Sequence, residues 1–239
     1  MRTFYLIRHG RTAGNLERRY IGSTDEPLCP EGRQEISGLR APEADRVFAS
    51  PLKRCLETGA ILYPRKEPVV IPELAECRFG EFEGHKFEEL IRQNSYQQWF
   101  ASCGMDAPPG GESREEFKKR VLEGFEKVRR QCEKENVTRA ALVVHGGTIM
   151  ALMEEYARPR GDFYDYQVRN GEGYELILAD AAACDRRIPP GPCAGRSGVA
   201  YHPVRLMGRL IERLEPIIRR SLPGTKLFER LGGGILRSW

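Results

Sequence analysis

The sequence lacks the features that would assign it to a secreted or disulfide-rich class. Its seven cysteines are odd in number and scattered, and no two of them have the spacing of zinc ligands. No signal peptide precedes the first strand-like residues. These absences predict a protein of the reducing cytoplasm whose cysteines are inert, small apolar side chains.

A large net charge is also missing, and the charge that is present is unevenly distributed. The formal net charge is +4, of which residues 184–239 contribute +7 and residues 1–183 contribute −3. Nucleic-acid binding needs many basic side chains on one face to neutralise phosphates. The near-neutral main part therefore argues against a nucleic-acid partner, and the basicity belongs to the C-terminal tail.

The length and the pattern of apolar residues favour one large α/β domain with an appendage. The chain has 239 residues and 40% hydrophobic content. Strand-like runs alternate with segments of helical spacing, which predicts a mostly parallel sheet covered by helices. The runs are Thr3–Ile7, Arg46–Ala49, Pro68–Ile71, Ala140–Val144 and Tyr174–Ala179.

Capping and turn signals locate further elements. Ser50 and the proline after it predict the N-cap and first turn of a helix over Pro51–Leu62, which would aim Arg54 toward the sheet edge. Ser113 and Glu116 form a capping box, which predicts a long helix to about residue 135.

A hairpin is expected near the end of the domain. The turn Asn170–Gly173 predicts two strands around it, Phe163–Val168 and Tyr174–Leu178. These two strands would close the domain.

The first candidate site lies where an apolar strand stops at Arg8, His9 and Gly10. Open α/β sheets bind ligands at the carboxyl ends of their strands, and a glycine lets the backbone turn away from that edge. A neighbouring guanidinium disfavours the imidazolium form and offers forked donors to a phosphate. Arg8 and His9 are therefore interpreted as a phosphate-attacking pair.

Three further motifs follow in order: Ser50–Arg54, Leu74–Gly80 and Val143–Gly147. Together with the first motif they resemble the histidine phosphatases of the phosphoglycerate-mutase-like superfamily over residues 1–180. The resemblance implies a three-layer α/β/α domain and a phosphomonoesterase that acts through a phosphohistidine. No metal or other cofactor is expected, because arginines and imidazoles take the place of the usual cation.

The resemblance assigns roles to the motif residues. His9 becomes the phosphorylated nucleophile, and Arg8, Arg54 and His145 line the same phosphate pocket. His145 follows an apolar run just as His9 does, which supports a site shared between two strand ends. Cys55 and Cys77 lie next to expected site residues, but a catalytic thiol is not favoured.

Glu76 matches the acid of the family, which protonates the leaving oxygen and then accepts a proton from water. Glu81 and Glu83 follow closely, so the choice of proton donor within this acidic cluster stays open. Small polar groups are also expected to bind the phosphate, namely Thr12, Asn15 and Gly146.

The substrate is expected to be a small phosphomonoester. The segment from Gly84 to Glu112 is shorter than the insertion of the mutases, so water should reach the phosphohistidine. The chain resembles α-ribazole-5′-phosphate phosphatases of cobalamin nucleotide-loop assembly. The alternatives are, in order, a broad-specificity phosphatase, a phosphoglycerate mutase and a non-catalytic phosphate-binding scaffold. Three aromatic residues could contact an aromatic leaving group, although core packing is the more common role: Phe82, Trp99 and Phe100.

Residues 181–239 differ in character from the rest. A Pro/Gly-rich linker precedes a basic stretch whose apolar residues from Val204 to Ile218 mark one face of a possible helix, which could lie on a membrane or pair with a protein. Residues 201–235 resemble an N-terminal fragment of adenosylcobinamide-phosphate synthase, without a span long enough to cross a bilayer. We interpret the tail as a remnant or misjoined reading of a neighbouring cobalamin gene, with an ordinary basic tail as the alternative. The sequence predicts no oligomeric state.

Overall fold

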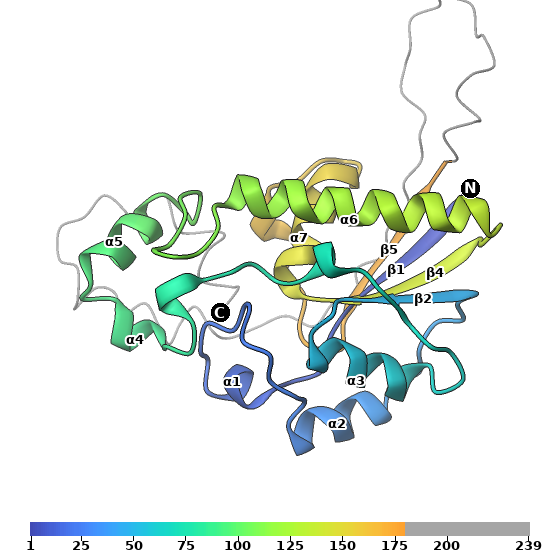
Figure 1. Ribbon diagram of the computed structural model, residues 1–239, viewed down its shortest axis with the longest axis horizontal. Coiled ribbons are helices and arrows are strands. Elements are labelled where there is room, and N and C mark those ends of the chain that lie inside the picture. The colour runs from blue at the N-terminus through green and yellow to red at the C-terminus, as the bar shows by residue number, and fades with distance from the viewer. Residues whose placement is uncertain (180–239) are drawn as a thin grey trace, which may run out of the picture.

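The computed structural model describes residues 1–179, so the expected linker and tail lie outside the described residues. The long elements alternate between strands and helices, as the sequence predicts (Figure 1). Their order is β1 (Arg2–Arg8), α1 (Ala13–Leu16), α2 (Pro30–Ser37), β2 (Arg46–Ala49), α3 (Lys53–Leu62), β3 (Val69–Val70), η1 (Pro72–Leu74), η2 (Gly80–Phe82), α4 (Phe87–Leu90), α5 (Asn94–Ala101), α6 (Arg114–Lys134), β4 (Arg139–Val144), α7 (Gly146–Tyr156), η3 (Phe163–Tyr166) and β5 (Gly173–Leu178).

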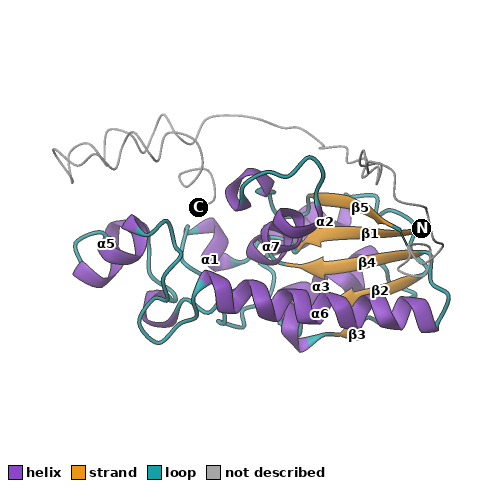
Figure 2. Ribbon diagram, turned by 90° about the horizontal axis from the view of Figure 1, so that it is seen from above, coloured by secondary structure: helices purple, strands orange, loops and turns teal. Residues whose placement is uncertain are grey.

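The strands form one sheet in the order β3-β2-β4-β1-β5. The pairs β1–β4, β2–β4 and β2–β3 are parallel, whereas β5 runs antiparallel to β1 at the edge. The predicted mostly parallel sheet is therefore confirmed. Because Arg8 is in register with Val144, the carboxyl ends of β1 and β4 lie side by side (Figure 2).

Helices cover both faces of this sheet, which makes three layers. Helices α6 and α7 lie on one face, and α2 and α3 lie on the other (Figure 1). Alternate residues of β1 face opposite sides of the sheet. Phe4 and Leu6 belong to the same buried cluster as Phe125 of α6, whereas Ile7 belongs to the cluster that contains Cys55 of α3. This alternation is the period of two expected for a strand covered on both faces.

A separate aromatic cluster lies beyond the carboxyl ends of the strands, around α4 and α5 (Figure 2). The hydroxyl groups of Tyr20 and Tyr96 are 2.5 Å apart inside it. Phe82, Trp99 and Phe100 are buried here, so they pack in this cluster as core residues, as their spacing favours.

Two local predictions were wrong. Helix α3 begins at Lys53 rather than Pro51, and Ser50 is not its N-cap because Leu52 holds that position. Residues 163–166 form a 3-10 helix rather than a strand, because Asp165 accepts a hydrogen bond from the Asp162 main chain and nucleates a turn. Phe163 and Tyr166 are then both buried, at the three-residue spacing of that helix.

The long helix α6 matches its prediction. Ser113 Oγ accepts from the Glu116 main chain, and the Glu116 carboxylate accepts from Ser113 N, as a capping box requires. Among the residues that the structure describes, no helix is long and apolar enough to cross a membrane.

Candidate active site

Polar side chains gather where three parallel strands end. His9 follows β1, Ser50 follows β2 and His145 follows β4. The main chain extends the sheet to this point, because His9 N donates to Val144 O at 3.0 Å and Ser50 N donates to Val143 O at 3.1 Å. The rings of His9 and His145 lie edge to face with centroids 5.1 Å apart, so the predicted meeting of the two imidazoles is confirmed.

The ring of His9 is held in one tautomer. Its Nδ1 lies 2.7 Å from Gly10 O, and a carbonyl oxygen can only accept, so Nδ1 carries the proton and the neutral ring keeps its lone pair on Nε2. Burial lowers the pKa of His9 well below its ordinary 6.5, and the charges of Arg54 and Arg8 lower it further. The ring is therefore neutral at neutral pH.

Both ring nitrogens of His145 have protein partners. Arg54 Nε donates to Nδ1 at 3.3 Å, so in the neutral ring Nε2 carries the proton and donates to Ser50 Oγ at 2.7 Å. Burial and then the charge of Arg54 hold the pKa of His145 well below 6.5. A hydrogen bond from Nε2 of His145 to a phosphate would thus require Ser50 to be exchanged for the ligand.

Arg54 is fully buried, and neutral acceptors hold its guanidinium group. Nη1 donates to Thr24 O at 2.6 Å and Nη2 donates to Gly22 O at 2.7 Å. Each Nη carries two hydrogens, so both atoms keep a donor for a ligand. Within residues 1–179 the hydrogen bonds of this buried cation all go to neutral groups, which favours an anion nearby.

Arg8 also has an N–H donor available for a ligand. Its Nη1 donates to Val168 O at 2.7 Å, whereas its buried Nε has no partner among residues 1–179. An unsatisfied buried donor costs about 1–3 kcal/mol, so a ligand that pairs with Nε is favoured. A Cβ atom on Gly146 would lie 3.3 Å from Arg8 Cζ, so this glycine leaves room for the guanidinium group.

The carboxylate of Glu76 is fixed between two main-chain donors. Cys77 N donates to Oε1 at 2.9 Å, and Gly147 N, in the first turn of α7, donates to Oε2 at 3.0 Å. A Cβ atom at position 147 would lie 2.3 Å from Oε1, so only glycine permits this approach. Burial raises the pKa of Glu76 above its ordinary 4.5, although both hydrogen bonds act to lower it.

Thr12 and Asn15 stabilise the loop after His9. Thr12 Oγ1 accepts from Asn15 N at 3.2 Å, and Asn15 Oδ1 accepts from Thr12 N at 3.3 Å. Asn170 donates to His9 O at 3.0 Å and ties the same loop to the turn before β5. Within residues 1–179, Asn15 Nδ2 has no hydrogen-bond partner and keeps its donors for a ligand.

Glu83 organises the loop that holds Arg54, a role that the sequence did not reveal. Its carboxylate accepts six hydrogen bonds: from the main chain of Gly22, Ser23, Thr24 and Phe79 and from the hydroxyl groups of Ser23 and Thr24. Gly22 and Thr24 are the residues whose carbonyl groups accept from Arg54. Glu83 therefore acts on the site through this loop, whereas Glu81 is exposed.

The thiols near the site are poor nucleophiles. Burial raises the pKa of both Cys55 and Cys77, which keeps them protonated at neutral pH. Cys55 Sγ lies 3.5 Å from His145 Nε2, so it packs against the site. In the part of the chain that the structure describes, no three His, Cys, Asp or Glu side chains are arranged to hold a metal ion.

Comparison with known families agrees with this geometry. The sequence profile of the histidine phosphatase superfamily (branch 1) matches residues 4–182. The chain belongs to this superfamily. It is a phosphatase with the phosphoglycerate-mutase-like α/β fold.

Individual relatives carry several names. The chain is 30% identical to the phosphoglycerate mutase-like protein 4 of Arabidopsis thaliana, over 64% of this chain and 70% of that protein. It is 31% identical to the adenosylcobalamin/alpha-ribazole phosphatase of Escherichia coli K12, over 62% of this chain and 76% of that protein. The crystal structure of the alpha-ribazole phosphatase from Shigella flexneri superimposes with a TM-score of 0.65 at 25% identity, covering 74% of this chain and 91% of that one.

The Glu83→Gln substitution should lower the free energy of unfolding by about 1–3 kcal/mol at pH 7, because an amide cannot accept all the hydrogen bonds of the loop. Burial acts to raise the pKa of Glu83, but the hydrogen bonds from Thr24, Gly22, Ser23 and Phe79 lower it below 4.5 overall. The stabilisation is thus present above pH 4.5 and is lost as the pH falls through the folded-state pKa. Urea unfolding at several pH values measures it, with Glu81→Gln as the control. Equal losses in both variants would contradict the role of Glu83.

Proposed function

We propose that this phosphatase hydrolyses small phosphomonoesters through a phosphohistidine at His9. The observation that carries the proposal is the tautomer of His9, because the contact of Nδ1 with Gly10 O leaves a neutral ring with its lone pair on Nε2. Arg8 and Arg54 keep donors for the phosphate oxygens beside that ring. These are the requirements of phosphoryl transfer: a placed nucleophile and fixed positive charge around the equatorial oxygens.

In the first step, Nε2 of His9 attacks phosphorus and the P–O ester bond breaks. The bonding pair goes to the leaving oxygen, which takes a proton from the carboxyl group of Glu76. The phosphorylated ring of His9 is positively charged, and Gly10 O stabilises it by accepting from Nδ1. The raised pKa of Glu76 favours the protonated carboxyl that this step requires.

In the second step, the carboxylate of Glu76 accepts a proton from water as the water oxygen attacks phosphorus. The P–N bond breaks, its electron pair returns to Nε2 of His9, and orthophosphate leaves. Glu76 and His9 are then in their starting protonation states. We further propose that Asn15, Thr12, Gly146 and His145 assist phosphate binding at the edges of the pocket.

Replacing the nucleophile should abolish turnover. His9→Ala should lower kcat by at least about a thousandfold, because the covalent step is lost. Rapid quenching of the wild-type enzyme with labelled substrate should trap protein-bound phosphate that is stable to alkali and labile to acid. His85→Ala is the matched control, since His85 is exposed and pairs with Glu89 on the surface. Undiminished turnover by His9→Ala would overturn the mechanism.

The role of Glu76 can be tested by changing the leaving group of the substrate. Glu76→Gln should lower kcat/KM for an alkyl phosphate by about a hundredfold, but far less for p-nitrophenyl phosphate, whose leaving group needs no proton. With the wild type and an alkyl phosphate, the rate should fall as the pH rises through the raised pKa of Glu76. The glutamine variant should lack this limb of the pH profile. The exposed Glu81→Gln serves as control, and an equal loss for both substrates would assign the acid elsewhere.

We also propose α-ribazole 5′-phosphate as the preferred substrate. Relatives named adenosylcobalamin/alpha-ribazole phosphatase from Escherichia coli and Salmonella typhimurium, at 31% and 27% identity, support this choice. Relatives of similar identity are named as phosphoglycerate mutases or as a phosphoserine phosphatase. Sequence identity alone therefore does not separate these substrates. The rates at which the protein turns over each of them must be measured.

A substrate panel with the full chain tests this choice. The value of kcat/KM for α-ribazole 5′-phosphate should exceed those for 3-phosphoglycerate and phosphoserine by at least about tenfold, the margin given by a few specific contacts. Conversion of 3-phosphoglycerate to 2-phosphoglycerate, followed by NMR, measures mutase activity in the same samples. A panel that ranks α-ribazole 5′-phosphate last would reject the substrate while leaving the phosphatase mechanism intact.

A further inference from the structure

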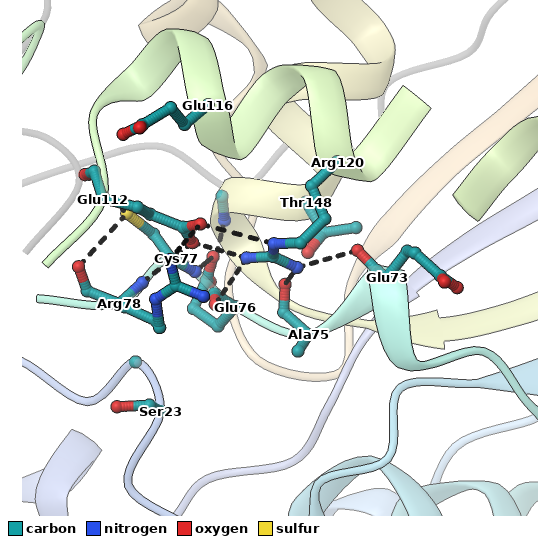
Figure 3. Close-up of polar contacts among 12 residues, drawn as sticks. Ser23, Glu73, Ala75, Glu76, Cys77, Arg78, Glu112, Glu116, Arg120 and Thr148 are labelled. Carbon is teal, nitrogen blue, oxygen red and sulfur yellow. Dashed lines mark hydrogen bonds and ion pairs between the residues drawn. The ribbon is translucent and has the colours of Figure 1, made fainter. Parts of the chain in front are cut away.

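The backbone that carries Glu76 is not fixed by a helix or a strand. Glu76 lies between η1 and η2, in a stretch without regular structure. Figure 3 shows two side chains, Arg120 and Glu112, packed against this stretch. Arg120 belongs to α6, and Glu112 comes two residues before the first residue of that helix.

Arg120 binds the main chain on the N-terminal side of Glu76 and at Glu76 itself. Its Nη1 donates to Glu73 O at 2.8 Å and to Ala75 O at 3.0 Å. Its Nη2 donates to Glu76 O at 3.2 Å. One rigid guanidinium group therefore fixes three carbonyl groups within four residues, which the flexible ammonium group of a lysine could not do in the same way.

Glu112 binds the main chain on the C-terminal side of Glu76. Its Oε1 accepts from Arg78 N at 3.0 Å, and its own main-chain N donates to Arg78 O at 3.0 Å. The carboxylate also pairs with Arg120, at 2.5 Å from Nη2 and 3.3 Å from Nε. Glu112 is only 3% exposed, and its buried charge is balanced by Arg120 and, at 3.6 Å from its Oε2, by Nη2 of Arg78.

The pair is anchored beside the main hydrophobic core. Phe117 and Val121, on either side of Arg120 along α6, are buried in the main core. The carboxylate of Glu76 is held from another helix, because Gly147 of α7 donates to it. Glu76 is thus held at its main chain from α6 and at its carboxylate from α7.

We propose that Arg120 and Glu112 are positioning residues for proton transfer by Glu76, an inference that rests on the function proposed above. Within residues 1–179 neither has a hydrogen bond to the imidazoles or to the pocket arginines, although the charge of Arg120 contributes to lowering the pKa of His145. They act on Glu76 through the backbone of residues 73–78. Displacing a reacting group by about 1 Å can cost about a hundredfold in rate, so loosening this backbone should weaken the proton transfer. Attack by His9 should be much less affected.

The test is the dependence of kcat/KM on the leaving group. Arg120→Lys keeps a positive charge beside Glu112 but cannot hold three carbonyl groups together, and Glu112→Gln removes the charge that orients Arg120. In each variant kcat/KM should fall at least about tenfold for an alkyl phosphate and less than about twofold for p-nitrophenyl phosphate. The plot of log kcat/KM against leaving-group pKa should become steeper, as it should in Glu76→Gln.

Arg129→Lys is the matched control. Arg129 lies on the same helix, pairs with Glu126 at 3.0 Å and has a side-chain exposure of 21%, against 22% for Arg120. Its substitution should leave the leaving-group dependence unchanged. Circular dichroism and thermal unfolding of every variant show whether the fold is kept.

The outcomes separate this proposal from the one on which it rests. A steeper plot for Glu76→Gln together with a uniform loss for Arg120→Lys and Glu112→Gln would overturn the positioning role alone. A uniform loss for Glu76→Gln would instead overturn the assignment of the acid. Failure of both pair variants to fold would also count against the proposal, since the pair would then be needed for the scaffold rather than for proton transfer.

Discussion

The parallel pairing of β1 with β4 is the constraint on which the site depends. With Arg8 opposite Val144, the next residue of each strand is a histidine, and the two rings meet in a buried space. Burial beside Arg8 and Arg54 makes both imidazoles neutral, so the positive charge of the site resides in the guanidinium groups. The result is fixed positive charge around an uncharged ring nitrogen, an arrangement that suits the role proposed for His9 as a nucleophile toward a phosphate dianion.

Much of this arrangement could be predicted from the sequence because it follows from local patterns. Apolar runs that end in His9 and His145 predict two buried strands, and parallel strands bring their carboxyl ends to one edge. The capping box at Ser113 needs only residues three positions apart, and it set the start of α6 correctly. The order of the motifs then indicated the superfamily that the family profile confirms.

The rest depends on contacts between residues far apart in the sequence. Glu83 binds a loop 61 positions earlier, and Arg120 binds the main chain of Glu76 at a separation of 44. Ser50 appeared suited to cap a helix, yet its hydroxyl group contacts His145, 95 positions later. The strand expected at Phe163 does not form, for a local reason. The aspartate that precedes it, Asp162, caps a 3-10 helix, and such side-chain hydrogen bonds favour a turn over extended backbone.

The approach of Glu76 to the start of α7 couples two distant positions. A methyl group at residue 147 would collide with the carboxylate, so any residue larger than glycine would push the Glu76 carboxylate away from its main-chain donors. Replacing Glu76 by the shorter aspartate would make room for a side chain at position 147. It would also move the carboxylate oxygen away from the main-chain donor of α7. We therefore expect that redesign of either position must treat the two as a single unit, with the length of one side chain setting the permitted bulk of the other.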